Sequence, residues 1–218
     1  MAKKVFIGVG HGGIDGGAIA NGFKEKDLNL AIATSCRDEL LRHGVSVVLS
    51  RSKDEADPLT EEIKECNAFN PDYAIDIHNN AGGGDGVEIY HHFGGGKGKT
   101  LAQNILNEIV AIGQNSRGLK TKKNSLGKDY FGFIRSTVCP AAIVECAFID
   151  NKKDLSIIET LKGQRAMGTA IAKGILKTLG IAYQNEKLYT LTVSDLKKST
   201  ADSLKTDLAK KGYLVSVK

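Results

Sequence analysis

Short β-branched segments alternate with amphipathic helical segments along residues 5–179 of this chain. The segment Val5–Val9 is continuously apolar, as expected of a strand buried on both faces, and Leu28–Leu41 carries apolar residues at helical spacing. This alternation predicts an α/β domain with a largely parallel sheet. Further strands are expected at Val45–Leu49, Tyr73–Ile77, Val87–His91, Phe131–Arg135 and Ala141–Glu145, and further helices at Pro58–Phe69, Lys97–Ile112 and Leu161–Leu179. Residues 113–129 are expected to be irregular and basic.

Size and charge restrict the class of protein. The 218 residues, 41% hydrophobic and 25% charged, suit one well-packed soluble domain with a small appendage. No window approaches the roughly 18 apolar residues of a membrane span, so no membrane insertion is expected. The net charge of +5 favours polyanions. No basic run is interleaved with aromatic residues, so nucleic acid is not expected as a partner, whereas an anionic wall polymer is compatible.

The start of the sequence does not match a signal peptide. Basic residues precede the apolar segment Val5–Gly10, which is shorter than the apolar region of about 7–15 residues that export requires and has no cleavage site. The segment is interpreted as the first strand. The protein is therefore expected to be made in the cytoplasm without a classical export signal.

The four cysteines, Cys36, Cys66, Cys139 and Cys146, form no CxxC pair. Each lies in an apolar or helical context. Buried free thiols of a reducing compartment are therefore expected.

Residues able to bind a metal ion lie close to the ends of several of these segments. His11 follows the first strand, Glu25 precedes a helix, His78 follows the Tyr73–Ile77 strand and Glu145 ends an apolar run. Two imidazoles and a carboxylate form a set suited to zinc that leaves a fourth position for water. A further carboxylate nearby could take a proton from that water. The pattern indicates a zinc hydrolase.

Each of these residues also has a purely structural interpretation. Glu25 could stabilise a helix N-terminus through the macrodipole, and His78 could be a hydrogen-bonded core residue. Glu145 is harder to explain in this way, because an unpaired carboxylate after an apolar run is costly. Asp76 lies within a strand and could face away and pair locally.

Glycines surround His11 on both sides. They permit a sharp turn after the strand and the close approach of another group. The spacing of Gly8, Gly10 and Gly13 is also similar to the GxGxxG fingerprint of nucleotide-binding proteins. That fingerprint needs a helix starting at the last glycine, whereas the next helix is expected near Lys26. A dinucleotide site is therefore disfavoured.

Three blocks resemble the zinc-dependent N-acetylmuramoyl-L-alanine amidases of the amidase-3 family. The blocks are GHGGIDGGAIANGFKEKDLNLAIA, DIHNNAGGGDGVEIYHH and FIRSTVCPAAIVECAFIDNKKD, and they occur in the family's order and spacing. The resemblance covers roughly residues 3–179. It implies a twisted six-stranded sheet with helices on both faces.

The resemblance also implies roles for individual residues. By motif position, His11, Glu25 and His78 correspond to ligands of a Zn²⁺ cofactor, and Glu145 corresponds to the catalytic glutamate. Asn80 matches the family's asparagine two residues beyond the second histidine, and Arg135 matches a common basic residue before the proline; both are expected as substrate contacts. The opening block departs from the family, which often has Asp-Pro before the first Gly-His. That difference changes the loop backbone but removes no ligand.

Past Gly180 the character of the sequence changes. Residues 181–218 are expected to form a small β-α-β unit separate from the catalytic domain at residues 1–180, with strands at Leu188–Val193 and Tyr213–Val217 around a helix at Thr200–Lys211. The unit resembles half of a SPOR-like peptidoglycan-binding module. Its seven lysines against four acidic residues favour wall binding or self-association, although a solvated helix face explains the same charge.

The expected function is hydrolysis of the amide between N-acetylmuramic acid and L-alanine in bacterial peptidoglycan. A phage or prophage endolysin, released to the wall through a holin-made lesion, fits the missing export signal. A host autolysin or a sporulation amidase would use the same chemistry. A non-catalytic wall-binding protein of the same fold and an α/β nucleotide-binding protein are the alternatives from other classes.

Overall fold

The structure of the chain is a computed structural model that describes residues 2–185, 193 and 195–210. The chain divides into two compact units, Met1–Tyr183 and Gln184–Lys218. In the second unit the structure describes one helix, α7 (Lys198–Lys210), where a helix was expected at Thr200–Lys211. The strands expected at 188–193 and 213–217 lie outside the described residues, apart from Val193.

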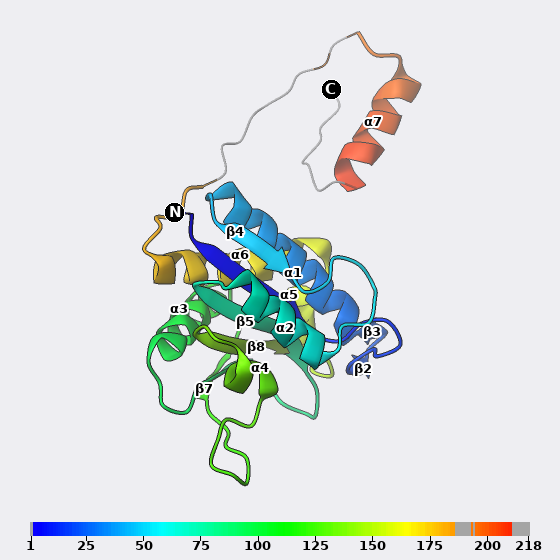
Figure 1. Cartoon of the computed structure of the whole chain (residues 1–218). Helices are drawn as coiled ribbons and strands as arrows, with labels where there is room; N and C mark the ends of the chain where they lie inside the picture. Colours follow the sequence, from blue (N-terminus) through cyan, green and yellow to red (C-terminus); the bar gives the residue numbers. More distant parts are fainter. Residues whose placement is uncertain (1, 186–192, 194, 211–218) are drawn as a thin grey trace. The chain divides into compact units, whose positions relative to one another are not determined.

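The first unit contains one main sheet and its covering helices (Figure 1). The strands of the sheet are β1 (Lys4–Val9), β4 (Ser46–Leu49), β5 (Tyr73–Asn80), β6 (Val87–His91), β7 (Ser116–Lys120) and β8 (Ala141–Phe148). The helices are α1 (Glu25–Arg42), α2 (Leu59–Phe69), α3 (Lys97–Ala111), α4 (Gly132–Ser136), α5 (Lys152–Ile158) and α6 (Leu161–Leu179). A short hairpin of β2 (Ile19–Ala20) and β3 (Phe23–Lys24) precedes α1.

The sheet has six strands in the order β4-β1-β5-β8-β6-β7 and is mostly parallel, as predicted. Strand β1 pairs in parallel with β4 and with β5, and β5 pairs in parallel with β8. Strand β6 runs antiparallel to β8 and parallel to β7. Because β1, β5 and β8 run in the same direction, their carboxyl ends meet at one edge of the sheet, which is where ligand sites form in open α/β sheets.

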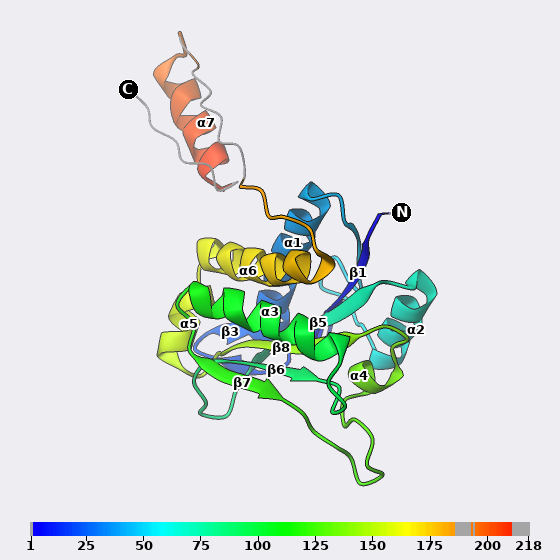
Figure 2. The same ribbon diagram turned by 90° about the vertical axis from the view of Figure 1, so that its left-hand side faces the viewer.

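Helices cover both faces of the sheet (Figure 2). Helices α1, α3 and α6 pack together on one face, and α2 and α4 lie on the other. The side chains of β1 alternate accordingly: Val5 and Ile7 belong to the large core cluster under α1, and Phe6 belongs to a second core cluster under α2. This second core cluster consists of Phe6, Cys66, Ala74, Phe133, Ile134, Ala141 and Ile143.

The strand expected at Phe131–Arg135 is wrong, because the structure has helix α4 there. The adjacent residues Phe133 and Ile134 are both buried in the second core cluster. A strand would send two consecutive side chains to opposite faces, so only a helical turn lets both reach the same cluster.

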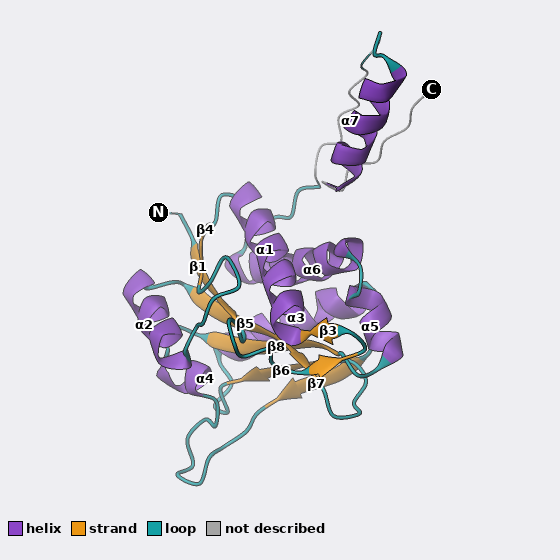
Figure 3. Ribbon diagram, turned by 90° about the vertical axis from the view of Figure 1, so that its right-hand side faces the viewer, coloured by secondary structure: helices purple, strands orange, loops and turns teal. Residues whose placement is uncertain are grey.

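The segment expected to be irregular contains β7, which pairs with β6 at the end of the sheet. Its residues are half-buried or exposed and include Arg117 and Lys120. Charged side chains are typical of edge strands, and they remove the apolar alternation by which a strand is recognised. Figure 3 shows that a long loop joins β7 to α4. Among the described residues, no helix combines the length and apolarity needed to cross a membrane.

The contact between α1 and α6 leaves no room for a side chain at Gly168. A Cβ atom there would lie 2.5 Å from the carbonyl oxygen of Ile32 and 2.8 Å from the amide nitrogen of Cys36. We therefore expect Gly168→Ala to lower the free energy of unfolding by about 1–3 kcal/mol, measured by urea denaturation. The matched change Lys162→Ala, on the exposed first turn of α6, should stay within about 0.5 kcal/mol of the wild type. Equal stability of both variants would contradict the close packing.

Candidate active site

His11 lies in the turn that follows β1, at the carboxyl edge of the sheet. Its backbone φ of 63° is in the left-handed region, which is uncommon for a residue with a side chain. The turn continues through a two-way backbone hydrogen bond between Gly12 and Asp15. This conformation directs the imidazole toward the first residue of α1.

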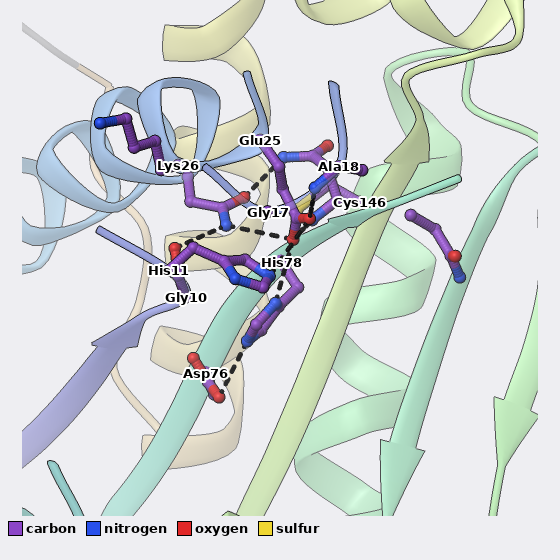
Figure 4. Close-up of polar contacts among 12 residues, drawn as sticks. Gly10, His11, Gly17, Ala18, Glu25, Lys26, Asp76, His78 and Cys146 are labelled. Carbon is purple, nitrogen blue, oxygen red and sulfur yellow. Dashed lines mark hydrogen bonds and ion pairs between the residues drawn. The ribbon is translucent and has the colours of Figure 1, made fainter. Parts of the chain in front are cut away.

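Glu25 is that first residue of α1, and its carboxylate bridges the two histidines (Figure 4). Its Oε2 lies 3.2 Å from Nε2 of His11, and its Oε1 lies 3.0 Å from Nδ1 of His78. Three further donors reach its two oxygens: the backbone N–H groups of Ala18 and Asn79 at 2.9 and 3.1 Å, and the side-chain amide of Asn29 at 3.3 Å. Glu25 is only 3% exposed, so all of these partners hold a buried charge in one place.

The outer nitrogen of each imidazole has its own carboxylate partner. Nδ1 of His11 lies 2.8 Å from Asp15 Oδ2, and Nε2 of His78 lies 3.2 Å from Asp76 Oδ2. The expectation that Asp76 faces away from the site is therefore wrong. Asp76 and His78 are two residues apart on β5 and so share one face of the sheet, a signal that was present in the sequence.

The carboxylate and the two imidazoles of this group shift one another's pKa values. Burial disfavours the charged form of Glu25, but hydrogen bonds from His11 and His78 outweigh it and hold the pKa of that carboxyl well below its usual range. The hydrogen bond to Glu25 raises the pKa of His11 against the opposing effect of burial. The pKa of His78 is also raised, because Asp76 and Glu25 overcome its burial.

The arrangement fits a metal ion. His11, Glu25 and His78 each offer one ligand atom, and these atoms lie within 4.8 Å of one another. The ring nitrogens that face Glu25 can bind a metal ion once they lose their protons. Asp15 and Asp76 remain hydrogen-bonded to the opposite nitrogens. Carboxylate partners of this kind fix the orientation of metal-binding histidines. Two imidazoles and one carboxylate are a donor set suited to zinc.

Glu145 lies beside this group, on the neighbouring strand. It is paired in register with His78 across β5 and β8, so both residues lie within strands that continue beyond the predicted ends. Burial raises the pKa of Glu145 to about 7, assisted by Glu25 and Asp76 and opposed by His78. A carboxyl group with a pKa near neutrality can exchange a proton in either direction.

One cavity of about 450 Å³ joins Glu145 to His11 and His78. Its wall is apolar and acidic, and neither lysine nor arginine is among the described residues that line it. The apolar part consists of Val9, Ile14, Ala56, Pro58, Leu59, Phe131, Phe133 and Ile143. The cavity can therefore accept an uncharged chain segment against the candidate metal ligands.

Three carboxylates behind His78 were not predicted from the sequence as a group. Asp57, Glu62 and Asp76 line the cavity, and each has one buried oxygen without a hydrogen-bond partner. Burial, together with Asp76 and Asp57, raises the pKa of Glu62 to about 10, so Glu62 is neutral at pH 7. Glu62 is on the buried face of α2, and nothing in its sequence context distinguishes it from a solvent-facing glutamate.

The glycines around His11 make the close approaches that the sequence indicated. A Cβ atom at Gly10 would overlap the imidazole ring of His78. At Gly17 it would lie 2.6 Å from Glu25 Oε2 and 2.7 Å from Cδ2 of His11, and the φ of 64° at this position also favours glycine.

Asn80 and Arg135, the two expected substrate contacts, do not line this cavity. Asn80, the last residue of β5, donates through its side-chain amide to Glu88 Oε1 at 3.2 Å. Arg135, on α4, donates to the backbone carbonyls of Asp129 and Tyr130 at 2.7 and 2.8 Å and lines a second cavity.

An open α/β sheet that brings two histidines, a carboxylate and a further, half-buried glutamate together at its carboxyl edge is an arrangement suited to a hydrolase. Comparison with known proteins agrees with this. The chain is 34% identical over 215 residues to the N-acetylmuramoyl-L-alanine amidase CwlM of Bacillus licheniformis, covering 96% of this chain and 82% of the relative. It is 33% identical over 190 residues to the endolysin of Bacillus phage SPP1, covering 83% of this chain and 68% of the relative.

Among solved structures, Cwp6 from Clostridium difficile superimposes with a TM-score of 0.81 at 39% identity, covering 82% of this chain and 30% of Cwp6. Residues 5–177 match Amidase_3, described as N-acetylmuramoyl-L-alanine amidase. The chain belongs to this family of amidases.

The overlap at Gly10 provides a test of the site geometry. We expect Gly10→Ala to displace His78 and lower zinc affinity by about tenfold or more, because a ligand displaced by about 1 Å loses most of its bond. Chelator competition measures the affinity. Gly16→Ala is the matched control, since its Cβ atom meets only the side-chain tip of Ile19 at 3.3 Å. Wild-type affinity in Gly10→Ala would show that His78 is not a ligand.

Proposed function

We propose that this protein is a zinc-dependent hydrolase that cleaves the amide between N-acetylmuramic acid and L-alanine in bacterial peptidoglycan. The observation that supports this most directly is the convergence of His11, Glu25 and His78 within 4.8 Å, with Glu145 in the same cavity. Membership of the amidase family supports the choice of substrate.

In this proposal His11, Glu25 and His78 hold one zinc ion. The ion supplies Lewis acidity that polarises the amide carbonyl and acidifies a water molecule. Asp15 and Asp76 accept hydrogen bonds from the outer imidazole nitrogens, which keeps the rings in the tautomer that presents the other nitrogen to the ion. Neutral Glu62 adds no further negative charge behind Asp76.

Glu145 moves the protons of the reaction. It accepts a proton from the attacking water as the new bond to the carbonyl carbon forms, and it then delivers that proton to the nitrogen of L-alanine as the C–N bond breaks. The products are a carboxylate on the lactyl group of the muramic acid and a free amino group on the stem peptide. The pKa of about 7 suits both halves of this transfer.

Asn80 and Arg135 are retained as proposed substrate contacts outside the main cavity. Each is close in sequence to a residue that lines the cavity. Asn80 comes two residues after His78, and Arg135 comes two residues after Phe133. We propose that extended glycan or peptide on either side of the cleaved bond reaches these two residues.

For the biological role we propose lysis of a phage-infected host, with a role in the host's own wall turnover or sporulation as the alternative. The similarity to both a bacterial amidase and a phage endolysin supports either role. In this proposal the enzyme acts at the bacterial cell wall, after holin-dependent release if it is an endolysin. Residues 181–218, with a net charge of +3, are proposed to bind the wall or to self-associate.

Digestion of purified Bacillus subtilis peptidoglycan tests the reaction. We expect new amino termini on L-alanine and no new reducing sugars, because the amide rather than the glycosidic bond is cleaved. A chelator should abolish the release and added zinc should restore it. New reducing ends, or turnover that survives the chelator, would contradict the proposal.

The matched variant for this experiment is Glu145→Gln, which keeps the shape of the side chain but cannot take a proton. Turnover should fall by about 10²–10⁴-fold, as for removal of a general base, while zinc affinity stays within a few-fold of the wild type. Loss of zinc in this variant would instead place Glu145 among the ligands.

Zinc affinity should rise with pH, because the metal-free protein holds protons on His11 and His78 that the ion must displace. Both folded-state pKa values are raised, so the charged imidazoles stabilise the metal-free fold below their unfolded pKa of about 6.5. This stabilisation is lost as the pH rises through the folded values. Between pH 6 and 8 we expect affinity to increase by up to about tenfold per pH unit for each displaced proton, measured by chelator competition. A flat pH profile would mean that the histidines bind no protons that zinc must replace.

A further inference from the structure

Two of the four cysteines lie at the second core cluster, on the face of the sheet that carries α2 and α4. Cys66, on α2, is fully buried in the second core cluster, and the half-buried Cys139, just before β8, packs against the same cluster. Asn67, the residue after Cys66, joins α2 to the segment that precedes Cys139. Its side chain donates to the carbonyl of Ser136 at 3.0 Å and accepts from the amide of Val138 at 2.8 Å.

The two thiols also influence each other's ionisation. The interaction with Cys139, together with burial, raises the pKa of the Cys66 thiol, and the interaction with Cys66 lowers the pKa of the Cys139 thiol despite its partial burial. Cys66 is buried and Cys139 only half-buried, so Cys139 is the sulfur of the pair that a small molecule can reach.

Cys139 opens onto a cavity of about 350 Å³ that is separate from the one at the candidate metal ligands. Its wall includes the basic side chains of His92, Lys97 and Arg135, and no acidic side chain is among the described residues that line it. Lys97 begins α3, so the positive end of that helix dipole faces the same space. A partly exposed thiol in electropositive surroundings is the environment of reactive cysteines.

The other two cysteines lack these features. Cys36 and Cys146 are fully buried, and burial raises the pKa of each thiol far above its usual range. They serve as internal comparisons for any chemistry at Cys139.

We propose that Cys139 and Cys66 form a dithiol that low-molecular-weight disulfides oxidise to an intramolecular disulfide. The Cys139 thiolate attacks one sulfur of the small disulfide, which forms a mixed disulfide and releases one small thiol. The Cys66 sulfur then attacks Cys139, which forms the protein disulfide and releases the second small thiol. Two protein thiols are oxidised, one small disulfide is reduced, and the protons of the two protein thiols pass to the two released thiolates.

The bond would connect two walls of the main cavity. Leu59 and Glu62 of α2 line that cavity, and β8, which begins two residues after Cys139, carries Glu145. A disulfide between these elements closes a long loop of the chain and so reduces the freedom of the unfolded state. It is expected to stabilise the first unit without supplying any group to the reaction.

Oxidised glutathione is the probe for the test, applied to the native full-length protein and read by intact mass and peptide mapping. The wild type should lose two hydrogens, retain no glutathione and show a Cys66–Cys139 cross-link. Cys66→Ala should instead hold one glutathionyl group on Cys139, and Cys139→Ala should stay unmodified. Cys146→Ala, the buried control, should behave as the wild type. Oxidised wild type should melt about 5–10 °C higher than reduced wild type.

Four alkylatable thiols in the unfolded wild type after this treatment would overturn the proposal, as would a cross-link to Cys36 or Cys146. If Cys66→Ala does not fold, the mass and peptide map of the wild type decide alone, because the cross-link is either present or absent. If glutathione stays on the wild type, Cys139 is reactive but Cys66 is not its partner, which also overturns the proposal.

Discussion

The site depends on one buried carboxylate. Glu25 is the first residue of α1 and is nearly excluded from water. Its carboxylate contacts a nitrogen of each imidazole and accepts hydrogen bonds from two backbone amides. These partners belong to three segments: His11 lies in the turn after β1, Ala18 lies just before β2, and His78 and Asn79 lie on β5. A buried charge is tolerated only when such partners surround it, so the position of Glu25 requires all of these segments to be in place at once.

That requirement connects the site to the sheet. The parallel pairing of β1 with β5 and of β5 with β8 brings His11, His78 and Glu145 to one edge although they are far apart in the chain. The sequence contained enough to predict this, because continuous apolar segments alternating with helices define a parallel sheet and the polar residues close to their ends define its functional edge. The rule covers His11 and His78, whereas Glu25 begins helix α1, and its place in the group was expected from the family resemblance.

Other parts could not be predicted for physical reasons. Strand β7 lies at the edge of the sheet and carries charges, so it lacks apolar alternation. Helix α4 is one short turn whose aromatic and β-branched residues are typical of strands, and tertiary burial of Phe133 and Ile134 decides its conformation. Glu62 is recognisable only after α2 is docked, because its unusual protonation arises from neighbours on other elements. Asp76 is different, since its spacing from His78 was visible in the sequence and its direction was misjudged.

Gly8, in β1, and Gly10, just after it, limit which substitutions related sequences can carry at this edge of the sheet. Space that a side chain at Gly8 would occupy belongs to the carboxyl groups of Glu62 and Asp76, and space at Gly10 belongs to the ring of His78. A larger residue at either glycine is therefore tolerated only with a simultaneous change in the side chain that fills its place, because contacting positions do not vary independently. Positions 8 and 62 should therefore covary in related sequences, whereas position 10 should stay glycine wherever position 78 is histidine.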